Sequence, residues 1–374
     1  MRSSWLWSGL CLIIVAACGT TEGTRRSPTP VDESQSLMSP DGFHATAWVL
    51  SLDREGYKDE ALWVDEDQLY IQTSDAEGYC VVHAVALATG VPKWMVRLPE
   101  KPLYAPGISA DRVAFVCGSK AVVVDRTTGV RTSPGPAYHL DFWASSPPAV
   151  TSDSLFVGSF IHRRLESISL ASGFNGWHFG LEDLVTIAPV VAGSSADKAL
   201  VVAAESGEVV GLPLRSADAP PPRDVLWTRT TGTNDVDCAA RGDIVYLASG
   251  DTFLYALNGL TGTVIWKCAA GAPFEGYLDL AGDLLLARTK NEFLAVDANT
   301  GEIRWRAPQL DRFVVALPGR VVCTTASGSL SVRDASDGHE RVCLSSPILE
   351  HVAVNHASDL LVFGDGAGQI TALR

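Results

Sequence analysis

Residues 293–305, FLAVDANTGEIRW, join a short apolar run, a turn at Thr300-Gly301 and a tryptophan four residues after the glycine. The same features return in the same order in FLYALNGLTGTVIW (253–266) and VVHAVALATGVPKW (81–94). Short apolar runs that end at Gly, Pro, Asp or Ser are typical of β-strands, and helical spacing of apolar residues is nearly absent. The pattern therefore predicts an all-β fold.

This stretch is one copy of a repeat. Six copies carry the turn glycine, and these are Gly90, Gly129, Gly173, Gly262, Gly301 and Gly338. Ala217 takes the place of the glycine in a seventh copy, and successive copies lie 37 to 45 residues apart. A period of about 40 residues with four short strands per copy is the signature of a β-propeller blade.

Tryptophan follows the turn in most copies, as Trp94, Trp177, Trp266 and Trp305, and as Trp227 after the longer turn RSADAPPPR (215–223). Ser133 and Val342 stand at this position in two degenerate copies. We expect each indole to pack against the next blade, where a large aromatic ring buries much apolar surface.

The eighth blade is split between the two ends of the chain. The last run, LLVFGDGAGQITALR (360–374), stops where a fourth strand should begin, whereas TAWVLSL (46–52) looks like a fourth strand with none before it. Pairing residues 46–52 with 369–373 would close the ring and remove an exposed edge. The 329 residues from Thr46 to Arg374 make about 41 per blade for eight blades. Residues 43–374 are therefore predicted to form an eight-bladed β-propeller with four-stranded blades.

The N-terminus has the features of an export signal. Arg2 precedes an apolar run from Leu10 to Ala17, which is too short to span a membrane, since that takes about 20 residues. The tetrad Val15-Ala16-Ala17-Cys18 resembles the bacterial lipobox, which implies that residues 1–17 are a lipoprotein signal peptide and that Cys18 is the lipid attachment site. Residues 18–42 are rich in Ser, Thr, Pro and Gly and are expected to form a flexible tether.

The repeat resembles that of the pyrroloquinoline-quinone-like (PQQ-like) propellers over nearly all of residues 46–374. Together with the lipobox and eight blades, the chain resembles the BamB-type lipoproteins, which support β-barrel assembly at the outer membrane as non-catalytic scaffolds. The resemblance implies a lipid-anchored protein on the periplasmic face of the bacterial outer membrane, a monomer within a complex. Lipoproteins that stay in the inner membrane of enteric bacteria typically carry Asp directly after the acylated cysteine. Gly19 stands there in this chain, which favours the outer membrane.

The amino-acid composition excludes some classes of binding partner. The chain has 374 residues, 47% of them hydrophobic, and 43 acidic residues against 29 Lys and Arg give a net charge of -14. Such a charge repels nucleic acid and anionic lipid. We expect an envelope protein or an extended peptide as partner, no nucleic acid, and membrane contact through the lipid anchor only.

No catalytic motif, metal site or cofactor is predicted. Apart from Cys18, the mature cysteines are Cys80, Cys117, Cys238, Cys268, Cys323 and Cys343, and none forms a CxxC motif. Because PQQ-like repeats also occur in enzymes and sensor domains, a quinone- or sugar-using enzyme of the central funnel and a ligand sensor stay as alternatives. The enzyme alternative predicts a cofactor absorption spectrum or a metal that survives dialysis.

The connections from each blade to the next are expected to ring one mouth of the propeller, with aromatic side chains on four of them. These connections carry Tyr104, Trp143, Tyr277, Phe313 and His351. We interpret Tyr104, Trp143, Tyr277 and Phe313, with Arg312, as a partner-binding rim, because Trp143 and Phe313 have polar, Pro-marked surroundings. The alternative is that these rings pack between blades as core. The 215–223 turn is expected on the opposite face.

Overall fold

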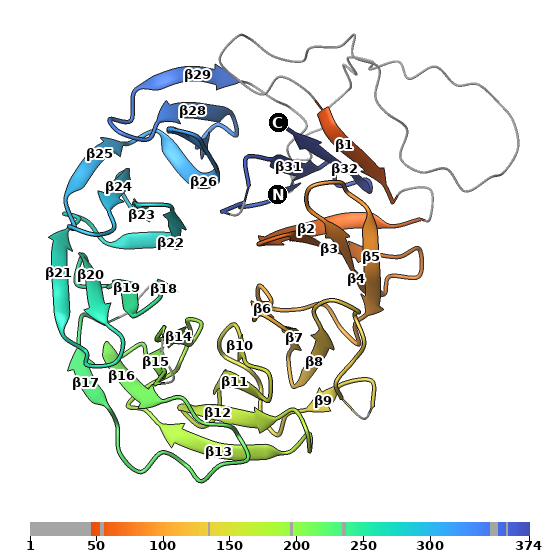
Figure 1. Ribbon diagram of the computed structural model, residues 1–374, viewed down its shortest axis with the longest axis vertical. Coiled ribbons are helices and arrows are strands. Elements are labelled where there is room, and N and C mark those ends of the chain that lie inside the picture. The colour runs from red at the N-terminus through yellow and green to blue at the C-terminus, as the bar shows by residue number, and fades with distance from the viewer. Residues whose placement is uncertain are drawn as a thin grey trace, which may run out of the picture.

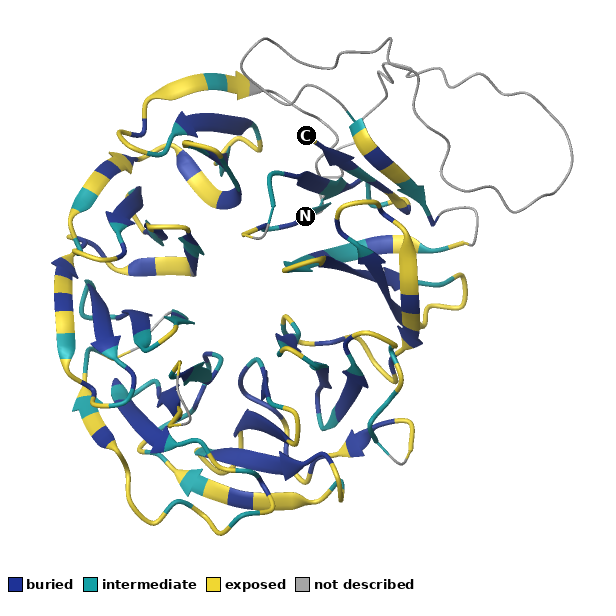
Figure 2. Ribbon diagram, in the orientation of Figure 1, coloured by how far each residue is buried: buried dark blue, intermediate teal, exposed yellow. Residues whose placement is uncertain are grey.

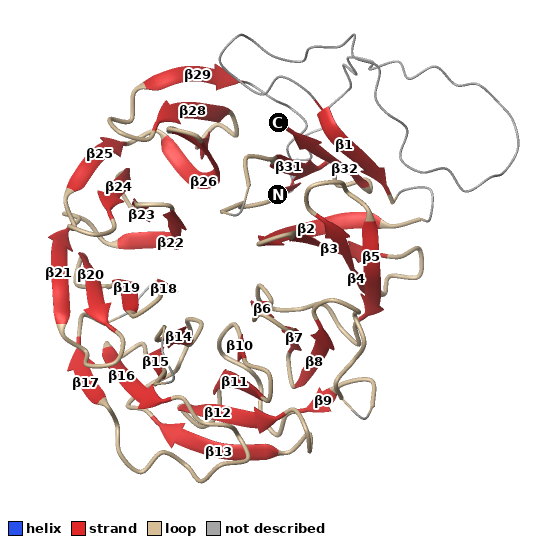
Figure 3. Ribbon diagram, viewed as in Figure 1, coloured by secondary structure: helices blue, strands red, loops and turns tan. Residues whose placement is uncertain are grey.

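The computed structural model describes residues 46–52, 56–133, 135–194, 197–233, 237–344, 351–356 and 358–374. The predicted signal peptide (1–17), Cys18 and the tether (18–42) lie outside the described residues. Within the described ranges the secondary structure consists of strands, turns and loops without helices (Figure 3). In this part of the chain there is accordingly no helix with the length and apolar character needed to cross a membrane.

The strands form eight antiparallel sheets of four strands each, arranged as a ring (Figure 1). In blades 1 to 7 the strands follow one another in chain order from the centre of the ring outward. The predicted all-β, eight-bladed propeller with four-stranded blades is therefore confirmed.

The first four blades lie between residues 58 and 230. Blade 1 consists of β2 (Lys58–Asp65), β3 (Gln68–Ser74), β4 (Cys80–Ala86) and β5 (Pro92–Arg97). Blade 2 consists of β6 (Gly107–Ile108), β7 (Arg112–Cys117), β8 (Lys120–Asp125) and β9 (Tyr138–His139). Blade 3 consists of β10 (Ala149–Val150), β11 (Ser154–Ser159), β12 (Arg164–Ser169) and β13 (Asn175–Gly180). Blade 4 consists of β14 (Val190–Ala192), β15 (Ala199–Ala203), β16 (Glu208–Pro213) and β17 (Trp227–Thr230).

The other four blades complete the ring. Blade 5 consists of β18 (Asp237–Arg241), β19 (Ile244–Ala248), β20 (Phe253–Asn258) and β21 (Val264–Ala269). Blade 6 consists of β22 (Phe274–Ala281), β23 (Leu284–Thr289), β24 (Phe293–Asp297) and β25 (Ile303–Ala307). Blade 7 consists of β26 (Leu310–Leu317), β27 (Arg320–Thr325), β28 (Leu330–Asp334) and β29 (Glu340–Leu344). Blade 8 consists of β30 (His351–Val352), β31 (Leu361–Gly364), β32 (Gln369–Leu373) and, from the other end of the chain, β1 (Thr46–Ser51).

Ring closure by the N-terminal strand is confirmed. β1 pairs antiparallel with β32, with Trp48 opposite Ala372 and Leu50 opposite Ile370. The two ends of the propeller thus complete one sheet, so the last blade has no missing outer strand (Figure 1). Closure removes a row of unpaired backbone groups that would otherwise invite aggregation.

The hydrophobic core lies between the blades. Buried residues form eight clusters, each spanning two adjacent sheets. Figure 2 shows why: the second and third strands of the blades are almost wholly buried, whereas the outer strands alternate between buried and exposed residues. The continuous apolar runs that end at each turn are therefore central strands, and the alternating ones are outer strands.

Tryptophan docking joins the blades in the way the repeat predicts. The indole N–H of Trp266 in blade 5 donates a hydrogen bond to the carbonyl of Ala298 in blade 6, at 3.0 Å. The ring lies against Gly301, where the backbone has a φ of +76° and an added Cβ would meet the indole at 2.7 Å. The same indole-to-carbonyl bond to the next blade is made by Trp48, Trp94, Trp177, Trp227 and Trp305.

The two degenerate copies differ in how they are completed. In blade 2, Tyr138 replaces the tryptophan: its ring lies against Gly173 and its hydroxyl donates to the carbonyl of Leu170 at 2.9 Å. In blade 7, Val342 has no turn glycine to meet, because the outer strand of blade 8 comes from the N-terminus. Blades 7 and 8 instead meet through aliphatic residues such as Val315 and Leu361.

Candidate functional site

The loops of the ring gather on two faces. The connection face holds the loops between blades and the hairpins between second and third strands; there the Thr231 N–H donates to the Gly207 carbonyl at 2.8 Å. The turn face holds the remaining hairpins and turns; there the Gly259 N–H donates to the Asp243 carbonyl at 2.7 Å. The connections between blades therefore share one face, and the 215–223 turn lies on the other, as predicted.

Four large apolar side chains are exposed together on the connection face at blades 2 and 3. They are Leu103, Trp143, Phe160 and Ile161, with 54%, 54%, 61% and 62% of their surface accessible, and we call them the apolar patch. Leu103 and Trp143 come from connections between blades, and the other two form the tip of the hairpin between β11 and β12. An exposed apolar group of this size and order usually marks an interaction site.

Backbone hydrogen bonds hold the loops of the apolar patch together. The Phe160 N–H donates to the Trp143 carbonyl at 2.8 Å, and the Leu103 N–H donates to the Val116 carbonyl at 3.1 Å. The Trp143 ring lies over the neighbouring hairpin, since a Cβ added at Gly118 would meet it at 2.9 Å. The apolar side chains are therefore presented by ordered backbone, which reduces the entropy lost on binding.

Basic side chains border the apolar patch. Ile161 is followed in the chain by His162, Arg163 and Arg164. Arg163 is largely exposed and lies 3.8 Å from the Asp183 carboxylate, too far for a strong ion pair. His162 and Arg164 both face the Glu166 carboxylate, so these side chains place hydrogen-bond donors at the edge of the apolar patch but little net positive charge.

The five residues of the predicted rim do not come together. Tyr104 and Trp143 are neighbours: the Tyr104 hydroxyl donates to the Ala144 carbonyl at 3.4 Å, and burial raises the pKa of Tyr104. Trp143 is exposed, as predicted, and belongs to the apolar patch. The backbone of Tyr277 lies in β22, and its side chain is outside the described part of the structure.

Phe313 is buried, so the prediction that it contacts a partner at the rim is wrong. None of its surface is exposed, because its ring stacks on His356 with centroids 4.9 Å apart and packs in the core between blades 6 and 7. The adjacent Arg312 is exposed and lines a cavity of about 330 Å³ with Glu275 and Asp311. Arg312 lies in β26, across the ring from the loop of Trp143 between β9 and β10 (Figure 1).

Hydrogen bonds and ion pairs between polar side chains link the innermost strands of blades 5 and 6 with each other and with blade 8. The Leu278 N–H donates to the Asp237 carboxylate at 2.9 Å, and His356 Nε2 lies 3.3 Å from the Asp279 carboxylate. Burial, with a contribution from the nearby Asp279 charge, raises the pKa of Asp237 to about 6. Among the described residues, no three His, Cys, Asp or Glu side chains are grouped so that they could hold a metal ion.

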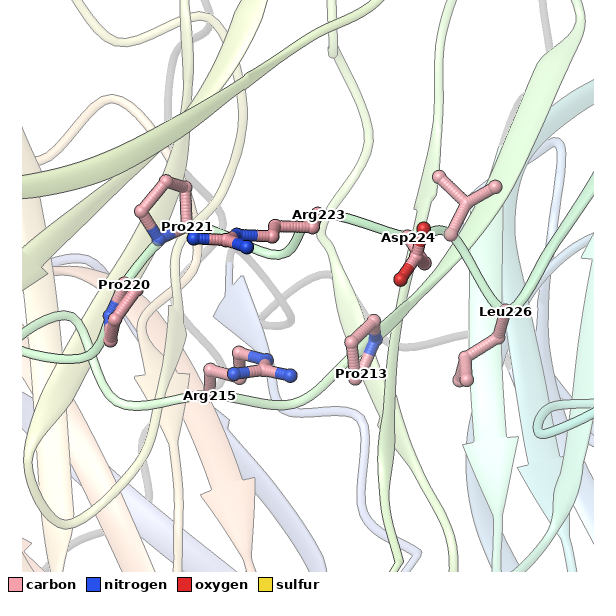
Figure 4. A pocket seen from close by; sticks show the side chains of 8 residues that line it. Pro213, Arg215, Pro220, Pro221, Arg223, Asp224 and Leu226 are labelled. Carbon is pink, nitrogen blue, oxygen red and sulfur yellow. The ribbon is translucent and has the colours of Figure 1, made fainter.

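Two further cavities lie on the turn face. The larger, of about 890 Å³, is bounded by the inner strands of blades 2 to 4 and by Lys198 and Arg215. The smaller, of about 450 Å³, lies within the long turn of blade 4, where Figure 4 shows the side chains of Arg215 and Arg223. Neither cavity was predicted from the sequence.

The sequence analysis missed Phe160 and Ile161. The corresponding hairpins of other blades carry polar or small tips, such as Ser206-Gly207 and Ser327-Gly328. An apolar pair at a hairpin tip departs from that pattern and could have been recognised as a binding signal.

Comparison with known proteins agrees with this architecture. Residues 215–347 match the family model described as "Outer membrane protein assembly factor BamB". The structure is similar to that of BamB from Moraxella catarrhalis, with a TM-score of 0.63 and 14% identity over 88% of this chain and 99% of that one. It is also similar to the computationally designed Ika8 protein, with a TM-score of 0.61 and 14% identity over 86% of this chain and 98% of that one.

No curated protein matches the chain in sequence. The resemblance to PQQ-like, BamB-type propellers that the repeat predicts is confirmed by the family match and by the structural likeness. At 14% identity, the structural likeness concerns the fold.

Proposed function

We propose that this chain is a non-catalytic scaffold of the bacterial envelope, anchored in the outer membrane through Cys18, that binds another envelope protein or an extended segment of one. The apolar patch on the connection face contacts the partner. Hydrogen-bond donors at its edge, such as the exposed Arg163, orient the partner segment by binding its carbonyl or carboxylate groups.

The observation that supports this proposal most strongly is the exposure of four large apolar side chains on ordered loops. Other large apolar side chains, such as Met95 and Phe174, are also exposed, but the four of the apolar patch lie on loops that are hydrogen-bonded or packed against one another above a well-filled core between blades 2 and 3. Trp and Phe are also the kind of anchors that dominate binding energy at interfaces.

The family match supports the choice of partner class. The model that residues 215–347 match is named for outer membrane protein assembly, and the structure resembles that of a BamB. An envelope protein at the outer membrane is therefore the partner that we infer for this chain.

The proposal is tested by placing a photo-crosslinking amino acid at Phe160 in the acylated protein in native membranes. We expect a defined crosslink to an outer-membrane assembly component, and we expect the change Trp143→Ser to reduce its yield about tenfold or more, as loss of an interface anchor does. Crosslinked bands identified by mass spectrometry provide the measurement.

Phe174 provides the matched control, because it is 76% exposed but lies in a turn on the opposite face. The same photo-crosslinking residue at Phe174 should give no such product. Equal products from both positions, or a Phe160 product that Trp143→Ser leaves unchanged, would show that the apolar patch is not the binding surface.

The anchor is tested separately. Cys18→Ser removes the thiol that would be acylated, so the protein should move from the membrane fraction to the soluble periplasmic fraction. Cys11→Ser, within the predicted signal peptide, is the control and should leave the partition unchanged. Membrane retention of the Cys18→Ser protein, measured by fractionation and immunoblotting, would contradict lipid anchoring through this residue.

A further inference from the structure

The turn between β16 and β17 is longer than the corresponding turns of the repeat and lines the open 450 Å³ cavity of the turn face. Three prolines and two arginines belong to its RSADAPPPR segment, 215–223. Trp227, which follows this long turn, docks against Gly262 in the same way as the tryptophans that follow short turns. The docking of the tryptophan therefore does not require the extra length. Ser216 and Ala217 belong to the docking site of Trp177, whereas the extra residues 219–223 are exposed or half-buried and have no evident packing role in the propeller.

The turn is anchored on both sides of the cavity. The Ala217 N–H donates to the Ser154 hydroxyl at 2.7 Å, and the indole N–H of Trp177 donates to the Ser216 carbonyl at 3.0 Å. On the returning side, the Leu226 N–H donates to the Gly211 carbonyl at 2.8 Å. Pro220 to Pro222 restrict the backbone between these anchors, because each ring fixes its own φ. The cavity walls are thus held before any ligand arrives.

Two guanidinium groups lie in this cavity. Arg215 extends from the outgoing side of the turn, and Arg223 runs along the returning side toward Pro221, so both guanidinium groups line the cavity (Figure 4). Both side chains are exposed, and neither has an ion-pair partner within the described ranges of the chain. Two positive charges facing one space repel each other unless an anion lies between them.

The other residues that line the cavity indicate which kind of anion would bind there. Pro213, Pro221, Val225 and Leu226 present apolar surface, and Asp224 contributes one negative charge beside the two positive ones. Net local charge is then +1, which favours a monoanion over a phosphate dianion. A planar carboxylate matches the paired N–H groups of arginine, and an apolar group attached to it would contact the proline and aliphatic side chains.

We propose that Arg215 and Arg223 form a binding site for a carboxylate attached to an apolar group. The cavity volume is within the range of small-ligand sites. The site lies on the turn face and does not depend on the apolar patch or on the proposed scaffold function.

The test is a titration of the full-length protein in detergent with N-acetyl-leucine, followed by saturation-transfer NMR on the leucine methyl groups. N-acetyl-leucinamide, which lacks the negative charge, and inorganic phosphate, which lacks the apolar group, are the comparison probes. We expect N-acetyl-leucine to bind at least about tenfold more tightly than either, given the strength of hydrogen bonds between charged groups.

Variants assign the binding to the two arginines. R215Q/R223Q should lower the affinity for N-acetyl-leucine at least about tenfold, and R215K/R223K should restore part of it, because lysine keeps the charge but not the planar pair of donors. The control K290Q/R374Q removes the same charge from two exposed residues outside the cavity and should bind as the unmodified protein does.

Unchanged affinity in R215Q/R223Q, an equal loss in K290Q/R374Q, or equally tight binding of the amide or of phosphate would overturn the proposal. The melting temperatures of all variants should agree, since both arginines are exposed. Crosslinking from Phe160 provides an independent result, so failure here and failure of the scaffold proposal are distinguishable.

Discussion

Trp266 and Trp143 show how differently one residue type is used in two regions of this molecule. Trp266 is 8% exposed, lies between blades 5 and 6, and gives its indole proton to a backbone carbonyl of the next blade. Trp143 is 54% exposed and rests on the hairpin of Gly118 on the connection face. The first is one of six equivalent positions around the ring, and the second has no counterpart in the repeat.

Aromatic residues that recur at the same position of successive blades are structural. Aromatic residues that lie outside the repeat pattern are the candidates for binding. A ring that must hold blades together needs a tight turn opposite it in the next blade, with glycine opposite five of the six tryptophans and Ala217 opposite Trp177, and this requirement forces regular spacing. A ring that meets a partner needs only a supported loop. We therefore expect changes at the blade interfaces to affect stability, and changes at the apolar patch to affect binding.

The largest effect is expected from deleting residues 43–52, which removes β1 and Trp48. Blade 8 would lose its outer strand, β32 would become an exposed edge, and the bond from the Trp48 indole to the Leu87 carbonyl would be lost. We expect aggregation or failure to recover a monomer, measured by size-exclusion chromatography. A monomeric truncation with unchanged urea stability would show that β1 does not hold the ring closed.

The next largest effect is expected from Trp266→Ala, which should lower the free energy of unfolding by about 3–5 kcal/mol. The reason is the cavity left against Gly301 and the lost hydrogen bond to the Ala298 carbonyl. Ile265→Ala is the matched control, because Ile265 is adjacent on β21 but 48% exposed, and it should change stability by about 0.5 kcal/mol or less. Similar urea midpoints for the two variants would contradict the docking role of the indole.

A further effect on stability depends on pH and comes from Asp237, an acidic residue that is desolvated on the inner strand of blade 5. Asp237 has a folded pKa of about 6 against about 3.9 in an unfolded chain. The folded state therefore binds the proton more tightly, and the stabilisation from protonated Asp237 is complete below about pH 4 and is lost as the pH rises through about 6.

Asp237→Asn isolates this contribution from the other titrating groups. The stability of the unmodified protein minus that of the Asn variant, from urea unfolding at several pH values, should fall between about pH 4 and pH 7. A difference that stays constant over this range would mean that Asp237 has an ordinary pKa.

The smallest effect on stability is expected at the apolar patch itself. Trp143→Ser should change the free energy of unfolding by about 0.5 kcal/mol or less, because the ring is half exposed and lies outside the blade interfaces. Together with reduced crosslinking from Phe160, this outcome would separate the two classes of tryptophan. A loss comparable to that of Trp266→Ala would place Trp143 in the structural class.

Much of the fold was predictable because a sequence repeat at regular spacing specifies each blade. The spacing of Gly301 and Trp305, repeated around the chain, specifies a turn and an indole that must meet across neighbouring blades. The unpaired run 46–52 and the incomplete end at 374 together predicted closure. Spacing could not identify Tyr138 as the substitute in blade 2, because it lies nine residues after Gly129 rather than four.

The sequence by itself determined the repeat, the number of blades, their strands and the way the ring closes, since each depends on local spacing and on alternation of apolar residues. Only the tertiary structure decided which aromatic residues face solvent. Trp143 and Phe313 both belong to polar, irregular surroundings, yet Phe313 is covered by His356 from the next blade, whereas Trp143 rests on the hairpin of Gly118 and stays half exposed. Exposure depends on neighbours that are distant in the chain. The same reason explains why Arg215 and Arg223, on opposite sides of one turn, could be recognised as a pair only once their shared cavity was known.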